Sequence, residues 1–195
     1  MFSIDFFQEH SIPWRDYTKN ELIFEQHQRA QNYYQIARGK VKLFSFNEDG
    51  KEFIQRFFYA GESFGEPPLL GDFNYPINAA ATESTRVYYI QKEIFFSLLK
   101  NYPNQHLALT QNLSKRLLHK SLLLKELSFE SPKHRILTLL NILKKDQVDH
   151  APSIVNYTRN EIANMTGLSI ETVIRTIKQL EKENKLELRN KKIYV

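Results

Sequence analysis

The sequence contains no cysteine and no long apolar run. Without cysteine the chain cannot form disulfides, thiolate zinc sites or cysteine-ligated iron–sulfur clusters. It also has no apolar stretch of about 18 residues, the length that indicates a membrane-spanning helix. The opening residues MFSIDFFQEH lack the cationic and apolar regions of a secretory signal. We therefore expect a cytoplasmic protein that makes no use of a membrane.

Clustered metal ligands are missing as well. The histidines do not form the His-x-His pattern of a cupin metal site; they stand at positions 10, 27, 106, 119, 134 and 150. Nothing in the sequence favours haem. An enzyme built on the N-terminal part would need clustered ligands or a nucleophile beside a base, and neither is present. We expect no metal, no cofactor and no catalytic site.

The net charge of +5 is concentrated in the last third of the chain. Residues 1–131 hold 15 Lys and Arg against 15 Asp and Glu, whereas residues 132–195 hold 12 against 7. A basic module beside a neutral one indicates a polyanionic partner for the basic module. A solvated basic surface without a partner is equally compatible with charge alone.

Residues 21–90 have the pattern of short strands. The segment 32–46, NYYQIARGKVKLFSF, is rich in aromatic and β-branched residues, and NEDG at 47–50 is a hairpin turn signal. Strands are also predicted within 51–66 and at 85–90. Several short strands at this spacing predict a sandwich or small barrel.

From residue 91 the apolar period becomes helical. A short helix is predicted up to Pro103, followed by a helix of about 25 residues within 104–131, where Gly and Pro are absent. Its leucines cover more than one stripe, which predicts two buried faces. One row has coiled-coil spacing and indicates a dimer seam with Lys120 at a skipped position; it consists of Leu113, Leu117, Leu124 and Leu127. The alternative is a core helix of a single chain.

The C-terminal part reads as a helix at 134–145, a linker with a short strand at 147–157, and a capped helix pair. Thr158 with Glu161 forms a capping box. Gly167 suits a tight corner, and Ser169 caps a second helix over 170–183. The segments LEL and IYV near the C-terminus predict a small two-stranded wing.

The second helix of this pair has two distinct faces. Its apolar residues recur at helical spacing and predict a core face, formed by Val173, Ile177 and Leu180. A different face is charged, and consists of Glu171, Arg175, Lys178 and Lys182. In a helix-turn-helix the N-terminal end of the second helix enters the major groove of DNA.

The side chains of the charged face suit base reading. Arg175 matches guanine N7 and O6, and Glu171 matches cytosine N4 while orienting Arg175 one turn away. The alternative is that these two form only an exposed ion pair. Further residues suit contacts to phosphate, namely Arg159, Ser169, Thr172 and Lys178.

At both ends the chain resembles the Crp–Fnr family of bacterial transcription regulators. TRNEIANMTGLSIETVIRTIKQLEKENKL is similar to the family's winged helix-turn-helix, and IARGKVKLFSFNEDGKEFIQRFFYAGESFGE is similar to its β-roll. The resemblance implies an α+β fold with three parts. These are a double-stranded β-helix (jelly-roll-like) domain over 1–103, a long dimerisation helix over 104–131, and a winged helix-turn-helix domain over 132–195.

The resemblance also implies a function, that of a homodimeric, sequence-specific regulator of transcription whose partners are double-stranded DNA and RNA polymerase. By this resemblance, Glu171 and Arg175 correspond to the family's base-reading pair. Ile170 stands where the cyclic-AMP receptor branch usually has Arg. We therefore expect Ile170 or Ile174 to touch a thymine methyl group instead.

The β-roll departs from the cyclic-AMP-binding pattern. Members that bind cyclic AMP have a Gly-Glu segment followed about ten residues later by an Arg that pairs with the cyclic phosphate. Here Gly65-Glu66 is present, but no Arg stands between Glu66 and Thr85, and residues 76–78 occupy the expected place. Pro67 and Pro68 also remove two N–H donors. We predict no tight binding of cyclic AMP and leave the effector open.

If the roll does take a small ligand, the resemblance indicates which residues line the pocket. They are Phe64, Gly65, Glu66, Asn78, Lys120 and Ser121. Lys120 and Ser121 stand where the family has an adenine-contacting Thr-Ser pair, so only the serine of that pair remains. The alternatives are that the aromatic residues are simply core, that Lys120 is solvated, and that the roll serves only as a structural or docking module.

Overall fold

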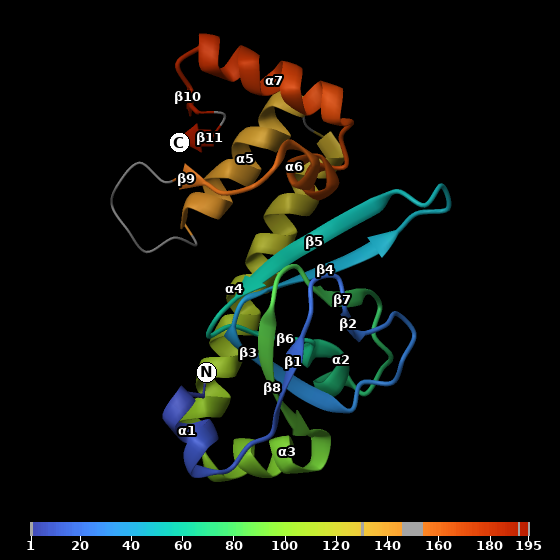
Figure 1. The fold of residues 1–195 in the computed structure, drawn as a ribbon, viewed down its shortest axis with the longest axis vertical. Helices are drawn as coiled ribbons and strands as arrows, with labels where there is room; N and C mark the ends of the chain where they lie inside the picture. Colours follow the sequence, from blue (N-terminus) through green and yellow to red (C-terminus); the bar gives the residue numbers. More distant parts are fainter. Residues whose placement is uncertain (1, 130, 146–153, 191, 195) are drawn as a thin grey trace. The chain divides into compact units, whose positions relative to one another are not determined.

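The computed structural model describes residues 2–129, 131–145, 154–190 and 192–194. They form two compact units, Met1–Asn112 and Leu113–Val195, and each is described by itself. The boundary between the units lies within the long helix α4, Pro103–Phe129 (Figure 1). This helix begins one residue before the predicted start, because proline is well tolerated in the first turn of a helix.

The first unit is built on two four-stranded antiparallel sheets, with the strand orders β1-β8-β3-β6 and β2-β7-β4-β5. The strands are β1 Trp14–Tyr17, β2 Leu22–Phe24, β3 Asn32–Arg38, β4 Lys40–Phe46, β5 Glu52–Tyr59, β6 Ser63–Phe64, β7 Asn78–Ala81 and β8 Thr85–Gln91. Strands that are distant in sequence pair with each other, as in β1 with β8 and β2 with β7. The predicted jelly-roll-like fold is confirmed.

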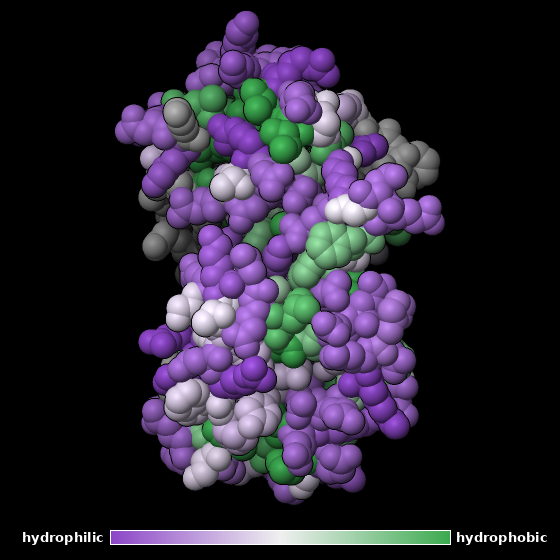
Figure 2. Space-filling view, turned by 45° about the vertical axis from the view of Figure 1, so that its right-hand side comes forward, coloured by the Kyte–Doolittle hydropathy of each residue, from purple (hydrophilic) through white to green (hydrophobic). Residues whose placement is uncertain are grey.

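Helix α4 leaves most of its described leucines exposed in the single chain. Leu109 is buried, but Leu117 is 67% exposed and Leu118 is 60% exposed. Figure 2 shows apolar patches among the hydrophilic residues of one face of the molecule. The prediction of two buried faces is therefore not met by this chain alone, and the exposed leucines leave a surface available for a partner.

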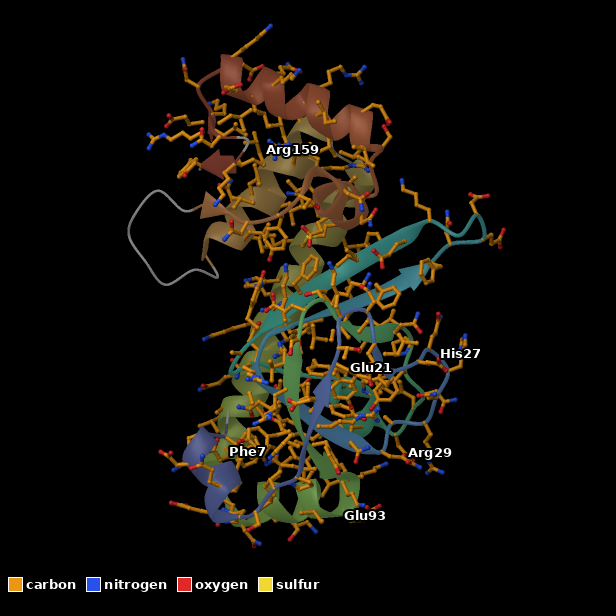
Figure 3. The ribbon with its side chains drawn as sticks, viewed as in Figure 1. Phe7, Glu21, His27, Arg29, Glu93 and Arg159 are labelled. Carbon is orange, nitrogen blue, oxygen red and sulfur yellow. The ribbon has the colours of Figure 1, made fainter. Side chains whose placement is uncertain are left out.

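An N-terminal helix that the sequence pattern did not reveal covers one end of the first unit. Helix α1, Ile4–Glu9, is capped by the Ser3 hydroxyl, which accepts a hydrogen bond from the backbone N–H of Phe6. Phe7 points into the roll (Figure 3) and stacks on Tyr88 of β8, with 4.2 Å between ring centroids. The helix α3, Lys92–Asn101, lies at the same end, because Phe2 also contacts Phe95.

The NEDG hairpin has the predicted turn. The backbone N–H of Gly50 donates to the carbonyl of Asn47 at 3.0 Å, and the Asn47 side chain accepts from the N–H of Lys51 at 2.8 Å. Asparagine side chains commonly form such hydrogen bonds to the backbone of their own turn. The turn connects β4 to β5, which pair from Lys40–Tyr59 to Phe46–Glu52.

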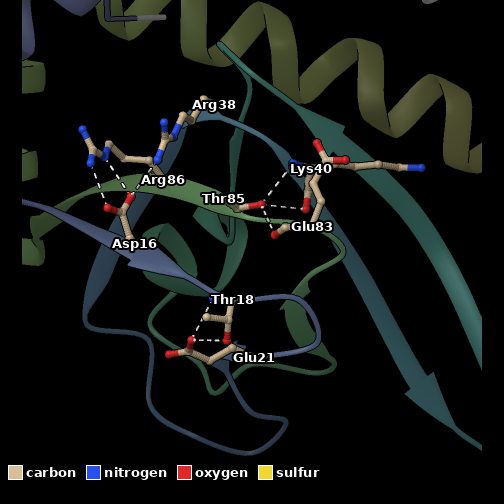
Figure 4. Close-up of polar contacts among 8 residues, drawn as sticks. All are labelled: Asp16, Thr18, Glu21, Arg38, Lys40, Glu83, Thr85 and Arg86. Atoms are coloured by element: carbon tan, nitrogen blue, oxygen red, sulfur yellow. Dashed lines mark hydrogen bonds and ion pairs between the residues drawn. The ribbon is translucent and has the colours of Figure 1, made fainter.

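A second corner brings Gly39 against β8. Gly39 has a φ of +92°, and a Cβ atom placed there would lie 2.5 Å from the Thr85 hydroxyl oxygen. The Thr85 hydroxyl bridges the backbone at this corner, since it accepts from the N–H of Lys40 and donates to the carbonyl of Glu83 (Figure 4). Only glycine combines the positive φ with the space that Thr85 leaves.

The second unit contains three helices and a small sheet. They are α5 Pro132–Lys145, α6 Arg159–Thr166 and α7 Ile170–Lys182, with β9 Ile154–Val155, β10 Glu187–Arg189 and β11 Lys192–Tyr194. The sheet order is β10-β11-β9, so the wing has three strands rather than the predicted two. Residues 146–153 of the predicted linker lie outside the described residues. No helix among the described residues is long and apolar enough to span a membrane.

We predict that Gly39→Ala lowers the free energy of unfolding by about 2–4 kcal/mol, because left-handed strain and a clash with Thr85 add together. Gly50→Ala is the matched control. Gly50 also has a positive φ, +73°, but nothing lies within 4 Å of an added Cβ. Its cost should be about 1–2 kcal/mol. Urea unfolding of both variants measures the difference, and equal losses would show that the close approach at Gly39 is unimportant.

Candidate nucleic-acid interface and ligand pocket

The helix pair of the second unit begins with the predicted capping box. The backbone N–H of Glu161 donates to the Thr158 hydroxyl at 3.1 Å, and the Glu161 carboxylate accepts from the N–H of Thr158 at 2.7 Å. Gly167 ends α6 with a φ of +70°. The predicted capping box and the predicted Gly167 corner are both confirmed. Each depends only on interactions within a few residues.

Helix α7 starts at a second cap. The Ser169 hydroxyl accepts from the backbone N–H of Thr172 at 3.2 Å and lies 3.0 Å from the Thr172 hydroxyl. Ser169 and Thr172, two of the four residues predicted to contact phosphate, are therefore already engaged in the cap. They place the N-terminal end of α7, with its partial positive charge, at the surface.

The inner face of α7 is fully buried. Val173 and Leu180 have no exposed surface, and Ile177 is 1% exposed. The predicted core face is therefore confirmed. Thr176 is buried too, which the apolar pattern did not indicate. Lys133 of α5 also forms an ion pair with Glu183, the residue that follows α7.

The outer face of α7 carries Glu171, Arg175 and Lys178, which are all exposed. Among the described residues Glu171 and Arg175 do not form an ion pair, although they stand one turn apart. The pKa of the Glu171 carboxyl is lowered, first by its own backbone N–H and then by the Ser169 hydroxyl. Arg175 and Lys178 have no hydrogen-bond or ion-pair partner in the described part of the chain.

Arg159 is the first residue of α6 (Figure 3). Its side chain is half-buried, and this burial lowers the pKa of its guanidinium group. An arginine stays protonated at neutral pH even after such a shift. It therefore provides a fixed positive charge near the start of the helix pair.

The first unit has an interior filled with aromatic rings. Phe64 has no exposed surface and stacks on Tyr34, with 5.4 Å between centroids. Tyr75, from the stretch that lacks the expected arginine, stacks on Phe24 at 3.7 Å. An added Cβ on Gly65 would lie 3.1 Å from the Phe24 ring and 3.4 Å from the Tyr75 ring. The protein's own rings therefore occupy the space beside Gly65.

Polar groups in this interior are buried rather than open to a ligand. Glu66 has no exposed surface and accepts a hydrogen bond from the Ser63 hydroxyl. Burial, followed by the neighbouring Tyr34 and then Glu66, raises the pKa of Tyr75. The Tyr75 hydroxyl is buried and has no hydrogen-bond partner among the described residues. Sequence reasoning missed Tyr75, because a tyrosine before a proline gives no sign of which ring it will meet.

The remaining pocket candidates come from different elements. Asn78 is half-buried, and its side-chain oxygen accepts from the backbone N–H of Gln26 at 2.9 Å. The helix α2, Glu66–Gly71, contains both predicted prolines in its first turn. Lys120 and Ser121 are exposed on the part of α4 that belongs to the second unit. No group of three or more His, Asp or Glu side chains suited to a metal ion exists among the described residues.

Comparison with known proteins agrees with this geometry. Residues 14–102 match the family described as "Cyclic nucleotide-binding domain", and residues 134–195 match "Crp-like helix-turn-helix domain". The cAMP-activated global transcriptional regulator CRP of Haemophilus influenzae is 31% identical over 98% of this chain and 87% of its own length. The chain belongs to the Crp–Fnr family. Its relatives in this family are transcription regulators, so it is a Crp–Fnr regulator with a nucleotide-binding-type domain and a DNA-binding helix-turn-helix.

Further proteins are similar to this chain. The Cyclic AMP receptor protein of Thermus thermophilus is 31% identical over 89% of this chain and 79% of its own length. The solved catabolite activator protein of Thermus thermophilus has a TM-score of 0.57 at 30% identity, covering 95% of this chain and 86% of that chain. FixK2 from Bradyrhizobium japonicum has a TM-score of 0.79 at 22% identity, covering 94% of this chain and 92% of that chain. At this low identity the likeness shows the fold alone.

Proposed function

We propose that this Crp–Fnr regulator is a homodimer that reads a near-palindromic DNA site through α7, and that its β-roll does not take cyclic AMP. One observation carries the DNA-reading part. Arg175 and Lys178 stand exposed and unpartnered on the outer face of a helix whose inner face is buried. A cation that is free in the unbound protein loses no internal partner when it binds DNA.

The residues of α7 take different roles in this proposal. Arg175 contacts guanine N7 and O6, and Glu171 accepts from cytosine N4. Glu171 and Arg175 form no ion pair with each other in the described residues, so each side chain is available to a base edge. Contacts to phosphate hold the helix in register and come from Arg159, Ser169, Thr172 and Lys178.

The exposed leucines of α4 support the homodimer. Leu117 and Leu124 are 67% and 66% exposed, and they belong to the row with coiled-coil spacing. Pairing this row with its copy removes apolar surface from water. Two copies of α7 separated by about 34 Å then match half-sites one helical turn apart. As a transcription regulator, the DNA-bound dimer would act on RNA polymerase.

The interior of the β-roll supports the absence of cyclic AMP. A cyclic phosphate carries a negative charge that needs a cationic or N–H partner when buried. Here the Arg is missing, two first-turn positions of α2 are prolines, and the rings of Phe24 and Tyr75 lie beside Gly65. The same fold is not tied to one ligand, since a neighbour in fold from Xanthomonas campestris is described as c-di-GMP responsive. The alternative is a regulator that responds to another small ligand through Phe64, Gly65, Glu66, Asn78, Lys120 and Ser121.

We predict that Arg175→Ala weakens binding to a selected operator by about 1–3 kcal/mol while binding to unrelated DNA changes little. Lys178→Ala is the comparison variant, because loss of a phosphate contact weakens both DNAs alike and lowers the salt dependence by about one charge. Fluorescence anisotropy at several salt concentrations measures both effects. An equal loss on both DNAs for Arg175→Ala would remove its base-reading role.

We predict that Leu117→Glu shifts the protein from dimer to monomer, because two carboxylates would meet in the apolar seam. Lys115→Glu is a matched control, since Lys115 is exposed on the same helix but off the leucine row. Sedimentation velocity measures the oligomeric state. A dimer that persists in Leu117→Glu would place the interface elsewhere.

We predict no heat of binding and no shift in melting temperature when up to millimolar cyclic AMP is added to the full chain. The physical reason is the missing cationic partner in a roll whose space beside Gly65 is filled. Calorimetry provides the measurement, with a protein that does bind cyclic AMP as positive control. Micromolar affinity would show that the roll rearranges its aromatic rings to admit the nucleotide.

A further inference from the structure

One lysine interrupts the leucine row of α4. Lys120 stands three residues after Leu117 and four before Leu124, so it occupies a seam position of the coiled-coil spacing. The two leucines beside it are 67% and 66% exposed in the single chain. Lys120 has no hydrogen-bond or ion-pair partner among the described residues. A charged side chain therefore stands in the middle of the face that we propose pairs with a second copy.

This stretch of α4 offers the lysine no neutralising partner. Residues 103–125 contain four Lys and Arg and no Asp or Glu. Arg116 stands four residues before Lys120, so the two cations are neighbours one helical turn apart. Partial burial, followed by the positive charge of Arg116, lowers the pKa of the Lys120 ammonium group. Cations thus accumulate at this point of the helix, and no carboxylate of the same stretch balances them.

Pairing α4 with its copy doubles this charge. In a parallel coiled coil each seam residue faces the same residue of the other helix. Two Lys120 side chains then meet across the seam, with an Arg116 side chain on each flank. Paired helices lie about 8–10 Å apart, which does not exceed the Debye length of about 10 Å at 0.1 M salt. Dissolved salt therefore screens the repulsion among the four cations only in part.

The flanks of the seam do not relieve this repulsion. Lysine in an apolar seam ordinarily extends its ammonium group to water along its flexible stem. Coiled coils commonly link the two helices by ion pairs between the flanking positions. Here these positions are Arg116 and Ser121, which cannot form an ion pair with each other. The Lys120 ammonium group therefore leaves the seam only to approach a second cation, and the neutralising charge has to come from outside the chain.

Resting on the proposed homodimer, we infer that two copies of α4 together form a binding site for a multivalent phosphate anion, held by Lys120 and Arg116 of both copies. Arginine suits this anion because its planar guanidinium group binds two phosphate oxygens at once, and lysine adds a mobile point charge. Neither copy has the site alone, so anion binding and dimerisation stabilise each other. A free polyphosphate and the polyphosphate chain of a nucleotide supply the same chemistry.

Sedimentation equilibrium of the full chain tests the site, with sodium pyrophosphate added at constant ionic strength. Mass action predicts that the dimer dissociation constant falls about tenfold once pyrophosphate reaches ten times its own dissociation constant. ATP without magnesium is the second probe. An equal response to both anions assigns the binding to phosphate charge alone. A response to ATP at lower concentrations than pyrophosphate shows that the nucleoside adds contacts to the same site.

The variants assign the response to the seam. Lys120→Gln should abolish the response, because it removes the seam charge from both copies and keeps a polar side chain. Arg116→Gln should weaken it by removing the flanking charges. Lys115→Gln is the matched control, since Lys115 is exposed on the same helix but stands off the leucine row. Its response should equal that of the wild type, and circular dichroism checks that all three variants keep their helix content.

The outcomes separate this inference from the dimer on which it rests. A chain that stays monomeric under every condition, or a dimer that survives Leu117→Glu, would overturn the α4 homodimer and the anion site with it. A dimer that depends on Leu117 but responds to neither pyrophosphate nor ATP would overturn only the anion site. A full response in Lys120→Gln would also overturn it, because the anion would then act elsewhere on the protein.

Discussion

Burial of the inner face of α7 is the constraint on which the proposed DNA-reading surface depends. Val173, Ile177 and Leu180 are almost completely removed from water, and each such side chain contributes about 1.5–3 kcal/mol relative to an exposed one. Rotating the helix about its axis would expose all three at once. Their burial therefore also fixes the outward direction of Arg175.

The two caps of the helix pair add local order to that constraint. Thr158 and Ser169 satisfy N–H groups that would otherwise lack partners at helix starts. The pKa of the Glu171 carboxyl is lowered at the Ser169 end, because backbone N–H and hydroxyl donors and the positive end of the helix favour its charged form. A Glu171–Arg175 ion pair would be exposed to water and therefore weak, and the two side chains do not form one in the described residues. The consequence is a free arginine on the outer face.

The first unit combines the sheets of its family with an interior rich in aromatic rings. Aromatic stacking between Phe24 and Tyr75 and between Tyr34 and Phe64 fills the roll with the chain's own rings. Such pairs add to the stabilisation that comes from buried area. This packing supports the proposal that the roll does not take cyclic AMP.

The sequence by itself determined the capping box at Thr158, the Ser169 cap, the Gly167 corner, the NEDG hairpin and the core face of α7. Each is encoded by residues within a few positions of one another, where capping, turn chemistry and helical spacing act. The family followed from motifs of the same local kind. Only the tertiary structure decided that α1 covers the roll through Phe7, that β9 joins the wing, and that Tyr75 stacks on Phe24. These contacts join residues far apart in the chain, and pairing at that range depends on the shape of the whole fold rather than on local propensity.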